Sequence, residues 1–171
     1  WIPEAVTQIR DGHYSKAETI YRQGMQRAPE NAAPALHLAR LYVEWNRPHR
    51  GLEALDEAVA RGAVVDLVSP LRFELLEQAG DWVQLRKESR KRLSQMPNDP
   101  TAWQAMTIAS MHQGDCAAAI ESAIGWISRE PTSSSEAAYY LAILSTDPDR
   151  LARFAPDLYQ LTSGCSEYLP T

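Results

Sequence analysis

The chain has 171 residues, of which 44% are hydrophobic, and its formal net charge at pH 7 is −5. A chain of this size has enough apolar surface to bury a core, and its acidic balance argues against general nucleic-acid binding, which needs a broad basic surface. No apolar run approaches the roughly 18 residues that suggest a membrane-spanning helix. The composition therefore predicts one compact folded body without a membrane-inserted segment in this range.

Turn-forming residues recur along the chain at one fixed interval. Four of them stand 34 residues apart, namely Gly12, Asn46, Gly80 and Gly114. A second set keeps the same spacing, namely Pro29, Ala63, Pro97 and Pro131. Apolar residues recur at three-to-four spacing on either side of each turn residue, so every period predicts two antiparallel helices.

The predicted helix pairs divide the chain into units that we expect to form a single domain over residues 1–171. Their ranges are about 1–31, 32–65, 66–99 and 100–133, with a partial fifth unit and a C-terminal cap in 134–171. At the start, Pro3 follows Trp1 closely, so the first helix either begins here or continues from upstream structure. The chain opens at Trp1 rather than at methionine, which leaves an upstream anchor open.

The repeated unit resembles the tetratricopeptide repeat family, whose period is 34 residues. The resemblance covers about residues 1–147, and its marks are an aromatic opener, a glycine turn, small residues and a closing proline. The first unit shows these marks at Trp1, Gly12, Ala17, Tyr21 and Pro29, and the fourth at Trp103, Gly114, Ala119 and Pro131. The resemblance implies an all-α fold, a right-handed superhelix of antiparallel helix pairs, that binds protein partners without catalysis or cofactor.

Two units depart from the family pattern at core positions. Leu85 stands where a small residue is expected and Ser89 where a bulky one is, and the fourth unit makes a similar exchange with Ala123 and Trp126. The total volume of the core matters more than which helix position supplies it. We therefore interpret the large residue at one position and the small residue at the other as compensating for one another.

Helix starts carry matching chemistry. Asp99 and Asp147 each precede a proline. The carboxylate can cap the helix, and proline at the first helical position costs nothing, because the backbone N–H that it lacks would have no partner within the helix. Ser133 with Glu136 fits a capping box, so the polar run 132–135 is interpreted as a helix start rather than as a nucleophile.

No catalytic or metal-binding arrangement is predicted. The histidines are scattered and none joins a second histidine or a cysteine at zinc-ligand spacing, and we expect no cofactor and no metal. His37 and His112 should lie on first helices, where hydrogen bonding to a partner is favoured over acid-base chemistry. His13 and His49 fall in or beside turns.

One basic run interrupts the acidic chain. Residues 86–92 hold five positive charges, including Arg86, Lys87, Arg90 and Lys91. The family's geometry puts this helix on the convex side, so a solvated face is one interpretation and docking of an acidic partner or an anionic lipid is another. Nucleic acid is disfavoured because only Trp82 offers a stacking ring nearby.

The two cysteines form no CxxC motif. We predict that Cys116 and Cys165 are linked if the protein matures outside the cytoplasm, with Pro156 turning the tail back toward the repeats. The alternative is two unpaired thiols.

In the resembled family, the first helices line a concave groove that holds an extended peptide or a partner helix. We expect binding to centre on the second to fourth units. The family's lysine and asparagine clamp for a terminal carboxylate is missing here, which disfavours a chaperone cofactor. The projected groove residues are Leu36, His37, Arg40, Val43, Glu44, Leu71, Glu74, Glu77, Gln78, Gln104, Ile108, Met111, His112, Tyr139 and Ala142.

The sequence thus predicts a non-catalytic scaffold whose protein or peptide partner is not identified. Fourteen arginines against three lysines favour a bacterial gene of high GC content. With the non-methionine start and the two cysteines, this favours a periplasm-facing or envelope-associated module in envelope assembly or export. A cytoplasmic location stays open, as does a structural or regulatory segment of a larger enzyme or secretion component.

Overall fold

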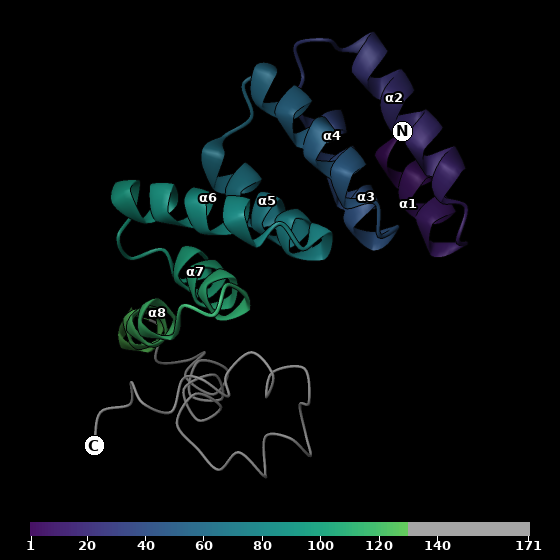
Figure 1. The fold of residues 1–171 in the computed structure, drawn as a ribbon. Helices are drawn as coiled ribbons and strands as arrows, with labels where there is room; N and C mark the ends of the chain where they lie inside the picture. The colour runs from purple at the N-terminus through teal and green to yellow at the C-terminus, as the bar shows by residue number, and fades with distance from the viewer. Residues whose placement is uncertain (130–171) are drawn as a thin grey trace. The chain divides into compact units, whose positions relative to one another are not determined.

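The computed structural model describes residues 1–129, and every regular element in this range is an α-helix (Figure 1). The chain forms two compact units, Trp1–Asp81 and a second that begins at Trp82. The boundary falls inside the third predicted helix pair. Each unit is described by itself.

The first unit holds five helices. They are α1 (Ile2–Arg10), α2 (Tyr14–Arg27), α3 (Ala33–Glu44), α4 (Pro48–Ala60) and α5 (Val65–Ala79). Each helix packs on the next one in sequence, and α3 also packs on α5. This pattern of neighbours is the one that stacked helix pairs produce, because each pair buries its apolar faces only against the adjoining pair.

The described part of the second unit holds three helices, α6 (Trp82–Gln95), α7 (Pro100–His112) and α8 (Cys116–Arg129). Helix α7 packs on both α6 and α8. None of the residues 1–129 lies in a strand, so the all-α prediction is confirmed for the described range.

The four periodic turn residues all adopt left-handed backbone conformations. Their φ angles are +76° at Gly12, +52° at Asn46, +67° at Gly80 and +70° at Gly114. A β-carbon is disfavoured in this region, whereas glycine has none and asparagine tolerates it. The 34-residue spacing therefore marks four helix ends of one kind, as the sequence predicted.

The predicted cap at the start of α7 is present. The Asp99 carboxylate accepts hydrogen bonds from the backbone N–H groups of Thr101, at 3.0 Å, and Ala102, at 3.3 Å. The cap predicted at Asp147 and the capping box of Ser133 and Glu136 lie outside the described residues.

Polar contacts tie the successive helix pairs of the first unit together. The Tyr42 hydroxyl of α3 donates to Glu18 of α2 at 2.7 Å, and Arg22 donates to the same carboxylate oxygen at 2.9 Å. Burial acts to raise the pKa of Glu18, but the hydrogen bonds from Tyr42 and Arg22 outweigh it and leave this pKa below its ordinary value. Glu18 therefore stays ionised within a partly buried network.

Arg61, just after α4, joins the same two pairs at their other end. Its guanidinium donates to the carbonyl oxygens of Met25, at 3.1 Å, and Pro29, at 2.7 Å. The last carbonyls of a helix have no partner within the helix, so Arg61 satisfies the end of α2 from the next repeat.

The exchanged core positions of the second unit are all buried. Leu85 and Ser89 on α6 are both 0% exposed, and on α8 Ala123 is 0% and Trp126 2% exposed. The interpretation that large and small residues compensate for one another in the core requires all four side chains to be buried, and they are.

Candidate partner-binding surfaces

Helices α3 and α5 lie side by side in the first unit and present one surface. The Gln78 side chain of α5 donates to the backbone carbonyl of Val43 on α3 at 3.2 Å. We call the predicted groove residues on these two helices, apart from the buried Leu71, the α3–α5 surface. They are Leu36, His37, Arg40, Val43, Glu44, Glu74, Glu77 and Gln78.

The α3–α5 surface is mixed in polarity. Arg40, Glu44 and Glu74 are exposed, whereas Leu36 and Val43 are half-buried and rest against the core. Leu71 is 8% exposed and belongs to the core. The surface therefore offers a half-covered apolar strip with charged groups beside it.

His37 belongs to a ring cluster at the edge of this surface. Its imidazole stacks on Tyr21 with the ring centroids 5.7 Å apart, and it meets Trp1 edge-on at 6.0 Å. Burial, with a smaller contribution from the charge of Arg40, lowers the pKa of His37. The ring is thus held neutral near pH 7, where it packs as an aromatic side chain.

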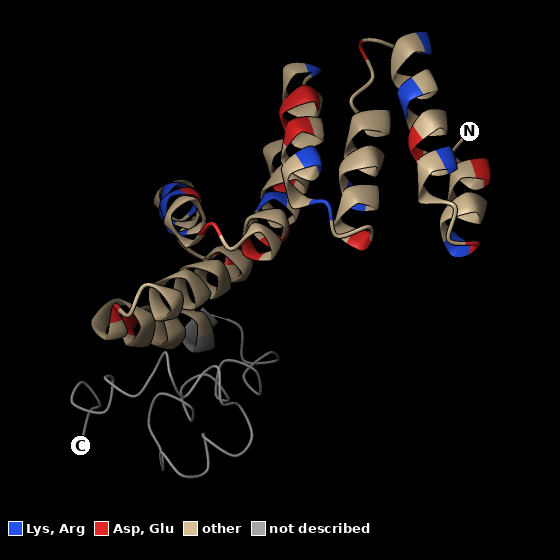
Figure 2. Cartoon of the chain, turned by 45° about the vertical axis from the view of Figure 1, so that its right-hand side comes forward, with Lys and Arg blue, Asp and Glu red and all other residues tan. Residues whose placement is uncertain are grey.

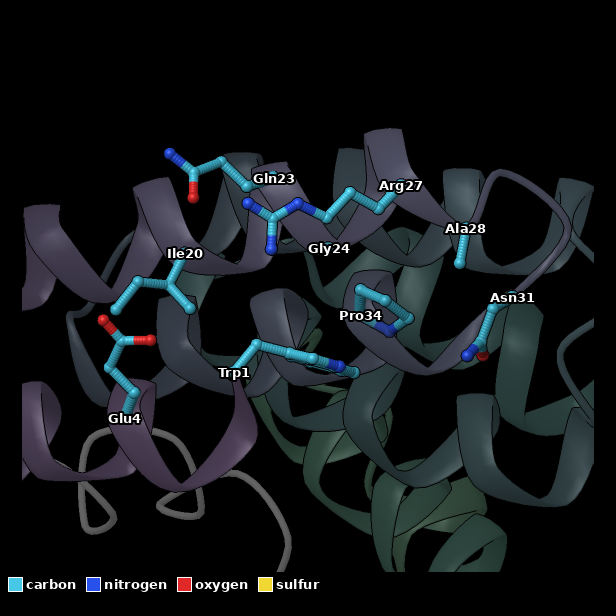
Figure 3. A pocket seen from close by; sticks show the side chains of 9 residues that line it. All are labelled: Trp1, Glu4, Ile20, Gln23, Gly24, Arg27, Ala28, Asn31 and Pro34. Atoms are coloured by element: carbon cyan, nitrogen blue, oxygen red, sulfur yellow. The ribbon is translucent and has the colours of Figure 1, made fainter.

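A small hollow of about 100 Å³ opens beside the same tryptophan (Figure 3). Trp1, Ile20 and Pro34 form its apolar wall, and Figure 3 shows the side chains of Gln23 and Arg27 above them. A β-carbon at position 24 would lie 3.5 Å from Pro34 and 3.6 Å from Trp1, so Gly24 leaves this space open. The hollow was not predicted from the sequence, in which Gly24 within a predicted helix is its signal.

Residues 8–66, which run from α1 into α5, match the family model described as tetratricopeptide repeat. This segment is similar to tetratricopeptide repeats. Such repeats generally mediate protein–protein interactions and generally have no catalytic role. No curated relative matches the chain.

Within residues 1–129, no three His, Cys, Asp or Glu side chains converge on a point that could hold a metal ion. In the same range, none of the helices combines the length and apolarity that crossing a bilayer would need.

Helix α7 carries the predicted groove residues of the second unit. Gln104 and Ile108 are half-buried and His112 is exposed. Met111, by contrast, is only 2% exposed, so it is a core residue and we leave it out of the proposed contacts. Two further predicted groove residues, Tyr139 and Ala142, lie outside the described residues.

His112 stacks face to face on Trp82 at the start of α6. The ring centroids are 3.6 Å apart and the planes differ by 3°. Partial desolvation of the imidazole lowers the pKa of His112. The stack joins the start of α6 to the end of α7. This contact was not predicted from the sequence.

The basic run divides between two environments, which corrects the expectation of one exposed patch. Arg86 donates to Asp115 and to Gln113, and Arg92 donates to Asp99 at 2.6 Å. Arg92 is 8% exposed and counts among the buried residues of α6. These two arginines therefore hold the second unit together, and only the remaining cations face outward.

The ion pair between Arg86 and Asp115 makes stability depend on pH. The hydrogen bond from Arg86, followed by that from the Ala118 N–H, lowers the pKa of Asp115. A carboxyl group whose pKa is lower in the folded state stabilises the fold above its unfolded pKa of about 3.9, and this stabilisation is lost as the pH falls through the lowered value.

We therefore expect Asp115→Asn, which keeps the helix cap, to lower the free energy of unfolding at neutral pH by less than about 1 kcal/mol, since the pair is partly exposed. Urea denaturation at a series of pH values checks this. The wild-type and variant stabilities should converge at acid pH. A difference that stays constant down to acid pH would contradict the assignment.

Cys116 begins α8 and is 8% exposed. Cys165 lies outside the described residues, so the pairing of the two cysteines stays a prediction.

Proposed function

We propose that this protein is a non-catalytic scaffold that binds a peptide segment or a helix of a partner protein on its α3–α5 surface. The main observation that supports this proposal is the hydrogen bond from Gln78 to the carbonyl of Val43, which joins the first helices of successive repeats. Side chains from two helices can then contact one ligand together.

The composition of the surface supports an internal segment as the ligand. Leu36 and Val43 are half-buried and offer apolar contacts that a partner would desolvate completely, whereas Arg40, Glu44 and Glu74 are exposed and offer directional polar contacts. Apolar anchors framed by polar groups are typical of peptide and helix recognition. On α7, Gln104, Ile108 and His112 stay predicted contacts.

We place the scaffold in envelope assembly or export of a bacterium. The arginine-rich composition and the two cysteines support this placement. A catalytic domain encoded upstream of this segment would instead favour a regulatory repeat within a larger enzyme. An upstream signal peptide or single apolar span would support the envelope.

Site-specific photocrosslinking in the native host tests the surface. A photoreactive amino acid at Arg40, Glu44 or Glu74 should give adducts with one and the same partner protein, because these exposed positions lie on the proposed contact face. Mass spectrometry of the adducts identifies the partner.

Matched exposed positions on the second helices serve as the control, namely Gln23 on α2 and Glu53 on α4. They should give no adduct with that partner. Adducts that form from α2 and α4 but not from α3 and α5 would show that the surface is misassigned.

A further inference from the structure

The outward side of α6 carries exposed cations that form no ion pair within the described residues. Leu85, Ser89 and Arg92 are buried and mark the inward side of the helix. With 3.6 residues per turn, Val83, Lys87, Arg90 and Lys91 lie on the opposite side, and all four are exposed. We call these four residues the α6 face. Figure 2 shows the basic residues crowded on this helix.

The cations of the α6 face form no ion pair within residues 1–129, although the charge of Arg90, after the hydrogen bond from Arg86, contributes to the lowered pKa of Asp115. Arg86 and Arg92 form ion pairs within the second unit, but within the described residues Lys87, Arg90 and Lys91 form none. In the first unit, Arg22, Arg61 and Arg72 each pair with a carboxylate. Exposed cations of that unit that form no ion pair, such as Arg10, Lys16 and Arg27, are spread over two helices, α1 and α2. The exposed charge on α6 is therefore available to a partner.

This charge is local. Helix α6 has five cations and one carboxylate, so the remainder of a chain of net charge −5 carries −9. Screening confines the attraction to about 8 Å at physiological salt. A small acidic group would meet only the cations, whereas an extended polyanion would also meet the acidic remainder.

We infer that the α6 face docks a short acidic segment of a partner protein. Lys87 and Lys91 are four residues apart in the helix, which separates them by about 6 Å along its axis. Alternate side chains of an extended peptide are separated by about 6.7 Å. Carboxylates at alternate positions of such a segment thus match the two lysines, with Arg90 between them.

The same face offers little to a nucleic acid. Its apolar member is Val83, which is 68% exposed and has no π-face for a base. The nearby ring of Trp82 is stacked on His112. Val83 lies one helical turn before Lys87, where it can contact an apolar side chain next to the acidic residues of the docked segment.

Fluorescence anisotropy at low salt tests the inference with a labelled peptide that has glutamate at alternate positions. The same peptide with glutamine at those positions serves as the comparison. The protein should bind the glutamate peptide with saturation and lose affinity as salt rises. Lys87→Glu/Arg90→Glu/Lys91→Glu should weaken binding by about tenfold or more, because three exposed charge pairs are reversed. Circular dichroism verifies that the variant is folded.

The matched control has the same change in net charge, made at exposed cations of the first unit, namely Arg10→Glu/Lys16→Glu/Arg27→Glu. This control should bind within about threefold of the wild type, since it changes the net charge equally but leaves every cation of α6 in place. If the α6 variant does not fold, Lys87→Gln/Arg90→Gln/Lys91→Gln replaces it and should give a smaller loss.

Two results would overturn the inference. One is an equal loss of affinity in the α6 variant and the control, which would mean that only net charge matters. The other is tighter binding of the wild-type protein to anionic phospholipid vesicles or duplex DNA than to the peptide.

Discussion

Asp99→Ala is expected to lower the free energy of unfolding of the second unit by about 4 kcal/mol. The Arg92 and Asp99 side chains are 9% and 12% exposed, and the nitrogen and oxygen atoms lie 2.6 Å apart. Removing one member of a buried ion pair costs about 3 to 5 kcal/mol, because the charge that remains loses that carboxylate while it stays buried. The variant also loses the cap of α7.

Urea denaturation measures the total loss, and hydrogen exchange at the amides of Thr101 and Ala102 reports the cap. Asp99→Asn should fall between the wild type and Asp99→Ala, because asparagine also caps helices. Asp115→Ala is the matched control. Asp115 has the same two roles, capping Ala118 and pairing with Arg86, but its side chain is 39% exposed. Its loss should stay below about 2 kcal/mol, and equal losses at the two sites would refute the role of burial.

Gly51→Leu is expected to destabilise the first unit by about 3 kcal/mol. A β-carbon at this position of α4 would lie 2.4 Å from a terminal methyl of Leu75, whose side chain is 0% exposed. Inserting further carbons into a filled core costs about 1 to 3 kcal/mol and occasionally more. Thermal and urea denaturation measure the effect.

The next repeat shows how the clash is relieved. Thirty-four residues after Gly51 and Leu75 stand Leu85 and Ala109, both 0% exposed, so large and small residues have exchanged places. Leu75→Ala alone should cost about 3 kcal/mol through the cavity it leaves. The double variant Gly51→Leu/Leu75→Ala should be more stable than either single variant. Additive losses would show that the two positions do not share one core volume.

The helical repeat was predictable from sequence because its signals are local. Gly12, Asn46, Gly80 and Gly114 must each adopt a positive φ, and the residues that tolerate this conformation are few. The cap at Asp99 was predictable for the same reason, since a capping side chain reaches only two or three residues along the chain. The family match over residues 8–66 agrees with this local pattern.

The surfaces were predictable only in part. The groove positions of the resembled family, projected onto the sequence, include Arg40, Glu44 and Glu74, which are exposed in the structure. They also include Met111, which the fold buries. Periodicity separates the faces of one helix, whereas exposure depends on which neighbouring helix covers each face.

The sequence by itself determined the helices, their turns and the small residues at which helices approach, because each depends on backbone conformation or on side chains a few residues apart. Only the tertiary structure decided how the charges are used. Nothing in the sequence of the run 86–92 distinguishes its five cations, yet Arg86 and Arg92 pair with Asp115 and Asp99, whereas the other cations are exposed. Ion pairs depend on distances between side chains from different helices, and those distances exist only once the helices have packed.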